Sequence, residues 1–313
     1  MRTHVKRFCW ILPIGLLWAC SVQPTTVPPT GTPIPPTATR KAFTVTHSPT
    51  PTEYLTSTAT PTSPPTATAT APKDVEVNLG AIHFVIPAGL ASSATVETTT
   101  DIEWPAVNPS FGTFPEHWVV TLEGYVLSKT GKTPRIVIFR TDEAMSIYDS
   151  QIKALRRLKD KGSLAKLPDQ TVSRLTMVIV SFKAQISQVS SSSNIGVRHL
   201  AQVFYMEVCP ITNEEIFYYY NGLSSDGNYF IFAELPVHAS FLQTSPNTHL
   251  VPAGGIPFPE GCTAEQLGQQ SCDAGEAKQY MRDITDKINA SEPGDWRPSL
   301  STLDELISSI YID

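Results

Sequence analysis

The segment Glu215–Leu235, EIFYYYNGLSSDGNYFIFAEL, determines the fold of this chain. It consists of two runs rich in aromatic and β-branched residues, separated by Ser225–Gly227. Such runs favour β-strands, and serine, aspartate and glycine between them favour a tight turn. The segment therefore predicts a β-hairpin.

The first strand of this hairpin carries three consecutive tyrosines. Side chains alternate between the two faces of a strand, so Phe217 and Tyr219 share one face while Tyr218 and Tyr220 share the other. One face must belong to the core. The other is either covered by helices, which is the interpretation we favour, or exposed as an aromatic platform for a sugar or a peptide.

Further strands are expected on the N-terminal side of the hairpin. In Met177–Val189, apolar and polar residues alternate in part, which indicates a strand. Ser190–Asn194 has the composition of a turn, and Ile195–Val208 has the pattern of a long strand. With the hairpin, these segments predict four consecutive antiparallel strands. Earlier in the chain, three shorter runs have strand composition: Ile82–Ile86, Trp118–Leu127 and Arg135–Arg140.

Three segments have helical periodicity. In 142–161 the apolar residues recur at intervals of three and four, and they are Met145, Tyr148, Ile152, Leu155 and Leu158. The others are Glu276–Asn289 and Ser301–Ile310, the latter with Ser301 as the expected N-cap. A block of strands with helices before and after it indicates the α+β class. We expect an antiparallel sheet, made of the four-strand meander plus two or three N-terminal strands, with helices packed on one face.

The region Ile195–Pro236 resembles exported bacterial lipoproteins of no assigned activity. The resemblance is carried by the Asn-x-Glu-x-Phe-Tyr motif beginning at Asn213, by the Gly-Leu-Ser turn motif beginning at Gly222, and by the Leu-Asp-x-Leu motif at Leu303. These are mostly turn and core residues, so the resemblance implies a fold and no activity. A fainter similarity is to the PsbP/Mog1 type of α/β/α sandwich.

The N-terminus has the three parts of a secretory signal peptide. A basic start precedes the apolar run Phe8–Trp18, which is too short for the roughly 20 residues of a membrane-spanning helix, and then comes the small residue Ala19. Leu17-Trp18-Ala19-Cys20 resembles the lipobox of bacterial lipoproteins, although Trp18 is bulkier than usual. The resemblance implies that cleavage leaves Cys20 as the first residue and that Cys20 carries acyl chains such as palmitate. The alternative is an ordinary signal peptide with an incidental cysteine.

Residues 21–72 form a low-complexity segment in which 12 Pro and 17 Thr make up more than half of the residues. With so few large apolar side chains, the segment cannot bury enough surface to fold. We therefore predict a signal peptide at 1–19, a lipidated N-terminus with a disordered stalk at 20–72, and a globular domain at 73–313. A flexible stalk of this length would span about 40 Å and a fully extended one about 160 Å.

The globular part is acidic. Residues 73–313 contain 18 Lys and Arg against 28 Asp and Glu, a net charge of −10, which argues against nucleic acid as a partner. Six of the cations cluster in or after the first helix: Lys153, Arg156, Arg157, Lys159, Lys161 and Lys166. They form either a solvated helix face or a surface attracted to an anionic bilayer or wall polymer.

Three cysteines lie in the globular part. In an oxidising compartment we expect a disulfide between Cys262 and Cys272, which bound a short loop. Cys209 would then be a small hydrophobic residue. Alternatively, Cys209 pairs with one of the other two. No His lies at zinc-ligand spacing from the pair, so we expect no metal.

The sequence contains none of the common catalytic motifs. G-x-S-x-G, H-E-x-x-H, the P-loop, G-x-G-x-x-G and the EF-hand loop are all missing. The domain's histidines are scattered, at His83, His117, His199, His238 and His249. His83 and His199 fall in strand patterns, whereas His117 and His238 fall at strand ends, where sites often gather. Glu214 and Glu215 are adjacent, so on a strand they would point to opposite faces.

These observations favour a membrane-anchored, extracytoplasmic lipoprotein of the cell envelope. Its domain would bind or scaffold an envelope protein, peptide or glycan, with the membrane contacted through the N-terminal lipid and with no catalytic residue or cofactor. The alternatives are a cell-envelope hydrolase without a recognisable motif and a purely structural envelope protein. A cleft that brings His117 or His238 within hydrogen-bond reach of a carboxylate would favour the hydrolase.

Overall fold

The computed structural model describes residues 73–100, 115–127, 129, 132–162, 180–203, 209–246, 250–259 and 274–313. The predicted signal peptide, Cys20 and the stalk lie outside these residues, as do Cys262, Cys272, His249 and Lys166. Everything described belongs to a single compact unit.

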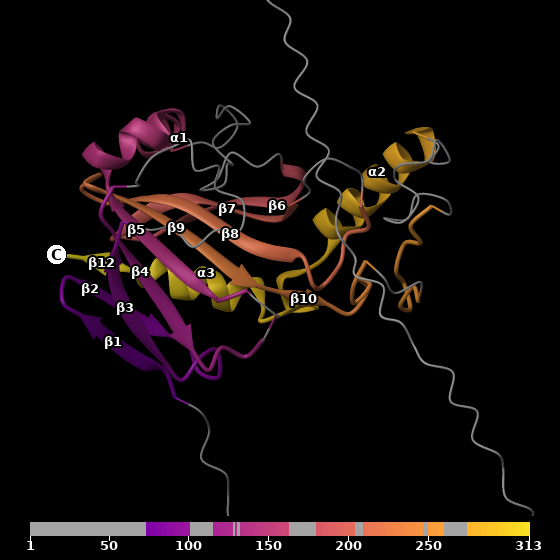
Figure 1. Ribbon diagram of the computed structural model, residues 1–313, viewed down its shortest axis with the longest axis horizontal. Helices are drawn as coiled ribbons and strands as arrows, with labels where there is room; N and C mark the ends of the chain where they lie inside the picture. Colours follow the sequence, from indigo (N-terminus) through magenta and orange to yellow (C-terminus); the bar gives the residue numbers. More distant parts are fainter. Residues whose placement is uncertain are drawn as a thin grey trace, which may run out of the picture. The chain divides into compact units, whose positions relative to one another are not determined.

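The central element is a seven-stranded antiparallel sheet in the order β3-β4-β5-β9-β8-β7-β6 (Figure 1). Two meanders build it, and β9 of the second lies beside β5 of the first. The strands are β3 (Ser93–Thr99), β4 (His117–Glu123), β5 (Arg135–Arg140), β6 (Val180–Ser190), β7 (Asn194–Val203), β8 (Ile216–Ser224) and β9 (Tyr229–Pro236).

Two smaller sheets and three helices complete the domain. One small sheet contains β1 (Val75–Leu79), β2 (Ile82–Ile86) and β12 (Tyr311–Ile312), and the other pairs β10 (His238–Ala239) with β11 (Trp296–Arg297). The helices are α1 (Thr141–Lys161), α2 (Ala274–Ala290) and α3 (Leu300–Ser308).

The α+β class, the antiparallel sheet and the four-strand meander β6–β9 are therefore confirmed. The strand at Ile82–Ile86 also forms, but it belongs to the small sheet. One part of the prediction differs from the structure, because helices cover both faces of the large sheet. Helix α1 packs on one face, while α2, α3 and the small β1-β2-β12 sheet pack on the other (Figure 1).

The reason lies in the composition of the central strands, which are apolar on both sides. In β8, Tyr219 packs with the α1 side and Tyr218 and Tyr220 with the α2–α3 side, and all three side chains are fully buried. Burying both faces of a sheet requires a layer on each side.

The hairpin turn forms as its residues predict. Gly227 adopts a φ of 81°, a conformation that favours glycine. The Asp226 carboxylate accepts hydrogen bonds from the Asn228 backbone at 3.0 Å and from the Ser224 hydroxyl. These bonds fix the register of β8 on β9.

Two further glycines, Gly196 in β7 and Gly222 in β8, face each other across the pair. The ring of Tyr220 lies against both of them, in the space that a Cβ atom would occupy. Glycine at both positions thus lets Tyr220 reach across to Asn194, where its hydroxyl donates a hydrogen bond of 3.0 Å to the side-chain oxygen.

Helix α3 begins earlier than predicted. Its N-cap is Ser299, whose hydroxyl accepts a hydrogen bond from the Thr302 backbone, so the expectation of Ser301 as the cap is wrong. Asp304 lies inside the helix, and its carboxylate accepts a hydrogen bond from the Tyr218 hydroxyl of the sheet.

Candidate functional site

The aromatic residues of β8 do not form an exposed platform. Tyr218, Tyr219 and Tyr220 have no solvent exposure, and burial raises the pKa of the Tyr218 and Tyr220 hydroxyls above the ordinary range. The interpretation that helices cover them is confirmed, and the hypothesis of an aromatic binding strip at these tyrosines is wrong.

The histidines do not converge on one place. His117 is buried, stacks on Phe139 at 4.6 Å and hydrogen-bonds the Pro115 carbonyl oxygen through Nδ1. His199 is buried beside Tyr219. His83 contacts Asp313 at 2.9 Å on the small sheet, and both side chains are partly exposed.

His238 is exposed on β10, directly after the hairpin. Its pKa lies below the ordinary value because of partial burial and the nearby cations Lys129 and Arg297. Among the described residues, the structure places neither His117 nor His238 in hydrogen-bond contact with a carboxylate.

A polar row crosses the α1 face of the sheet, formed by the register partners Arg135, Glu234, Tyr219 and His199 on β5, β9, β8 and β7. We call it the Glu234 row. The Glu234 carboxylate accepts hydrogen bonds from Arg135 Nη2 at 3.2 Å and from the Tyr219 hydroxyl at 2.9 Å. A buried carboxylate needs such partners, and here each of its oxygens has one.

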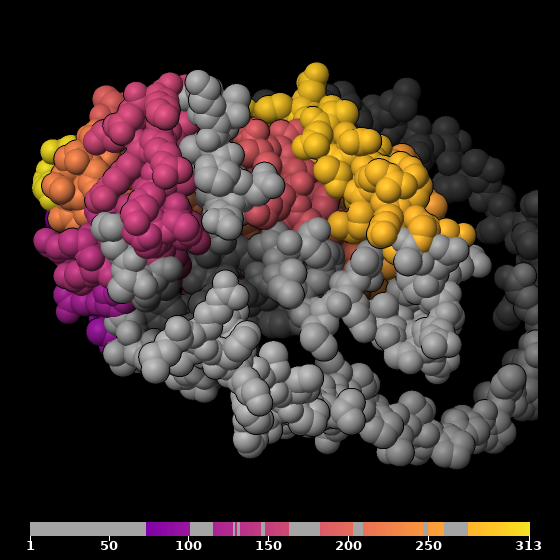
Figure 2. Space-filling view, turned by 90° about the horizontal axis from the view of Figure 1, so that it is seen from above, coloured from indigo at the N-terminus to yellow at the C-terminus, as the bar shows by residue number. Residues whose placement is uncertain are grey.

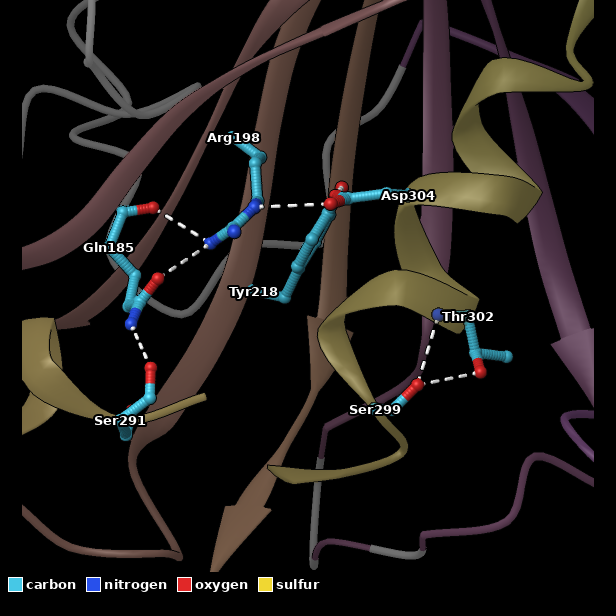
Figure 3. Close-up of polar contacts among 7 residues, drawn as sticks. All are labelled: Gln185, Arg198, Tyr218, Ser291, Ser299, Thr302 and Asp304. Atoms are coloured by element: carbon cyan, nitrogen blue, oxygen red, sulfur yellow. Dashed lines mark hydrogen bonds and ion pairs between the residues drawn. The ribbon is translucent and has the colours of Figure 1, made fainter. Parts of the chain in front are cut away.

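A second group of polar side chains lies on the opposite face, and we call it the Arg198 network (Figure 3). Arg198 donates to the backbone oxygen of Gln185 at 2.8 Å and lies 3.4 Å from the Asp304 carboxylate. Asp304 also accepts a hydrogen bond of 2.8 Å from the Tyr218 hydroxyl. Burial raises the pKa of Asp304 and outweighs the opposing effects of Arg198 and Tyr218.

Gln185 connects this network to the end of α2. It sits at an irregularity in β6 with a φ of 52°, and its side-chain nitrogen donates to the carbonyl oxygens of Ile288 and Ser291. Its backbone N–H donates to the Asn289 side chain at 2.7 Å. The Arg198 network therefore fastens α2 and α3 to β6, β7 and β8, which is a structural role.

Lys129 is the most perturbed amine among the described residues. Burial lowers its pKa to about 7, against the opposing effect of Glu215. Its amine donates to the Ile216 carbonyl oxygen and lies 4.3 Å from the centre of the Phe217 ring. A lysine with such a pKa can act as a base or nucleophile, but these two contacts account for its position. Glu214 and Glu215 precede β8, so they do not form the strand pair considered above.

The outer face of α1 carries several exposed cations. Figure 2 shows α1, in magenta, at the surface of the domain. Asp142 and Glu143 in its first turn and Lys159 and Lys161 in its last turn complement the helix dipole. Three further cations on α1 are exposed, Lys153, Arg156 and Arg157, and of these Lys153 pairs with Asp149 one turn earlier at 2.8 Å.

Beside these cations, Arg156 lines a pocket of about 280 Å³ together with the start of α1 and the hairpin turn. Arg140, which also lines the pocket, lies 3.6 Å from both Asp142 and Glu143. The pocket therefore contains both signs of charge. The candidate functional site is the exposed basic surface of Lys153, Arg156 and Arg157, which we call the α1 basic surface.

The described residues contain no cluster of three or more His, Cys, Asp or Glu side chains that could hold a metal ion. Within the same ranges, no helix is both long and apolar enough to cross a membrane. Cys209 is half-buried against the core. The predicted disulfide partners Cys262 and Cys272 lie outside the described ranges.

Comparison with protein-family models, with curated proteins and with solved structures finds no match for this chain. The functional argument therefore rests on the side chains themselves.

Proposed function

We propose that this chain is a lipid-anchored, non-enzymatic lipoprotein whose domain contacts the anionic surface of the membrane to which it is tethered. The observation that carries the proposal is the division of the polar groups. Two groups of ionisable side chains inside the domain, the Glu234 row and the Arg198 network, are held by hydrogen bonds and ion pairs, while the cations of α1, including Lys153 paired with Asp149 at 2.8 Å, lie on its exposed side.

Anchoring would come from Cys20, at the end of the lipobox-like sequence. Two acyl chains anchor a protein stably, whereas one binds only marginally. The stalk at 21–72 would keep the domain within about 40 Å of the membrane if it is flexible. This tether would raise the local concentration of the α1 basic surface at the bilayer.

Replacing Cys20 with serine should abolish lipid attachment. In a bacterial host, the full chain should incorporate labelled palmitate and sediment with membranes, while the Cys20→Ser chain should carry no label and appear in the soluble fraction. Ser21→Ala serves as the control and should behave like the native chain. Palmitate labelling of the Cys20→Ser chain, or its full retention in membranes, would contradict anchoring at Cys20.

Reversing the charge of Arg156 and Arg157 should weaken binding to anionic bilayers. Each cation near such a surface contributes about 1 kcal/mol, so the double Glu variant should bind at least about tenfold more weakly. The measurement is sedimentation of the non-lipidated Cys20→Ser chain with phosphatidylglycerol–phosphatidylcholine vesicles at low salt.

Lys278→Glu with Arg282→Glu on α2 is the matched control, because it makes the same change in net charge at exposed positions. This control should retain most of the binding. Equal losses in the two double variants would assign the effect to net charge, and a Cys20→Ser chain that fails to bind the vesicles would refute the membrane contact.

A further inference from the structure

The short β10–β11 pair brings two basic side chains together. His238 and Arg297 are register partners in this antiparallel pair, and both are exposed. Such partners point to the same face of a sheet, with their Cβ atoms about 5 Å apart. Like charges directly opposite each other destabilise a strand pair. A protonated His238 therefore opposes the pairing unless an anion lies beside it.

No carboxylate of the described residues compensates this pair. The His238 ring and the Arg297 guanidinium have no hydrogen-bond or ion-pair partner in the described part of the chain. The acidic residues just before β11, Glu292 and Asp295, instead accept each other's backbone N–H groups in a capping box. Three other arginines do pair with carboxylates: Arg135, Arg140 and Arg198.

A third cation lies beside the pair. The Lys129 amine donates to the Ile216 carbonyl oxygen, and the next residue, Phe217, is the register partner of the last residue of β9. Strand β10 begins two residues after β9 ends, so the amine lies close to His238. The pKa of His238 reflects this arrangement, since partial burial lowers it and both Lys129 and Arg297 lower it further.

The nearby carboxylates act on Lys129 and not on His238. Burial lowers the pKa of Lys129 to about 7, and the neighbouring Lys132 contributes in the same direction. Three carboxylates oppose this effect: Glu215, Glu234 and Glu214. The charged groups that shift the pKa of His238 are both cations. Among the described side chains, the positive potential at His238 is therefore left without an anion.

From this arrangement we propose that His238, Arg297 and Lys129 form a binding site for a phosphate group, which we call the His238 site. A guanidinium offers two parallel N–H donors to a phosphate, and an imidazolium and an ammonium can each add a donor. A phosphate dianion carries enough charge to favour the protonated forms of both titratable groups, whereas a carboxylate carries half as much.

The His238 site lies apart from the α1 basic surface. Arg156 of that surface lines a pocket with the hairpin turn, next to the first residue of β9, whereas His238 follows the last residue of β9 (Figure 1). The two places are thus at opposite ends of an eight-residue strand. The proposal goes beyond the membrane contact and does not rest on it.

Phosphate should raise the pKa of His238, because a bound anion favours the protonated ring. The measurement is an NMR pH titration of the histidine ring signals of the Cys20→Ser chain, with increasing sodium phosphate and with sodium chloride at equal ionic strength as the reference. The signal that is missing in the His238→Gln chain identifies the residue. Sulfate remains a dianion throughout the titration and should have the same effect, which separates binding from the titration of phosphate itself.

Arg297→Gln should weaken phosphate binding at least about tenfold, because it removes the fixed charge and the paired donors. Arg282→Gln on α2 is the matched control, since it makes the same change at another exposed arginine, and it should bind like the parent chain. Glycerol phosphate in the same titration distinguishes a phosphate ester, as in a lipid headgroup, from free phosphate, the tighter ligand identifying the source. A pKa of His238 that responds to phosphate no more than to chloride, or equal binding by Arg297→Gln and the parent chain, would overturn the proposal.

Discussion

Replacing Asn194 with aspartate should lower the free energy of unfolding by about 4 kcal/mol, although the two side chains have nearly the same shape. Asn194 is fully buried at the start of β7. Its amide nitrogen donates to the carbonyl oxygens of Ile307 at 2.9 Å and Ile310 at 3.0 Å, and its side-chain oxygen accepts from Tyr220.

The large expected loss of stability follows from the position of the Ile307 and Ile310 carbonyl groups. The last carbonyl groups of a helix have no partner inside the helix, and Asn194 supplies one at the end of α3. A carboxylate would present an oxygen instead of a donor to both carbonyls. It would also put a buried negative charge at the end of a helix that favours cations.

Urea denaturation of the non-lipidated Cys20→Ser chain measures the loss. Asn221→Asp is the matched control: Asn221 is almost fully buried on β8, and its amide nitrogen has no hydrogen-bond partner among the described residues. The Asn221→Asp variant buries the same charge without losing hydrogen bonds to the end of a helix. It should therefore lower the free energy of unfolding by less than Asn194→Asp does. A larger loss in Asn221→Asp would contradict the assigned role of Asn194.

The loss should also depend on pH. The buried carboxyl of the Asn194→Asp variant should have a pKa above its unfolded value, so protonation favours the folded state. The destabilisation is then smallest below the unfolded pKa of about 3.9 and grows as the pH rises through the folded pKa. The difference between the variant and the parent chain should therefore be smaller at pH 4.5 than at pH 7.5.

The parts of the fold that the sequence predicts are those encoded by neighbouring residues. The hairpin follows from the turn residues at Ser225–Gly227 and from alternation in the flanking runs. Helix α1 follows from apolar spacing, with Tyr148, Ile152 and Leu155 buried as expected. In both cases the determining contacts lie within a few residues of each other, so a local pattern contains the information.

The coverage of both sheet faces could also have been predicted. Strand β8 has large aromatic residues on each side, and a strand that faces water on one side would alternate with polar residues. The paired glycines Gly196 and Gly222 were a second signal, because glycine inside a strand often marks the close approach of another group. Here that group is the ring of Tyr220.

The polar groups of the interior could not be predicted in this way. Arg198 and Asp304 are more than one hundred residues apart in the chain, and they meet because α3 packs across β7 and β8. Arg135 and Glu234 are 99 residues apart, and they meet because β5 and β9 bring them into register. Such pairs depend on the order of the strands in the sheet, and the spacing of residues in the sequence does not predict that order.

Replacing Glu234 with alanine should lower the free energy of unfolding by about 3–5 kcal/mol, because it removes one partner of a buried ion pair. Arg135 would retain its charge and the Tyr219 hydroxyl would lose its acceptor, both in a largely buried setting. Glu234→Gln should lower the free energy of unfolding by less than Glu234→Ala, since the amide oxygen of glutamine still accepts one hydrogen bond. Urea denaturation of the Cys20→Ser chain measures both losses.

Replacing three side chains of the Glu234 row with apolar ones distinguishes a structural role of the row from a functional one. Buried ion pairs can often be exchanged for hydrophobic residues at little cost or with a gain. The triple variant Arg135→Met, Tyr219→Phe and Glu234→Leu should therefore stay within about 1 kcal/mol of the parent chain in stability. If the Glu234 row is structural, this variant also keeps vesicle binding. A stable triple variant that loses vesicle binding would show that the row takes part in function.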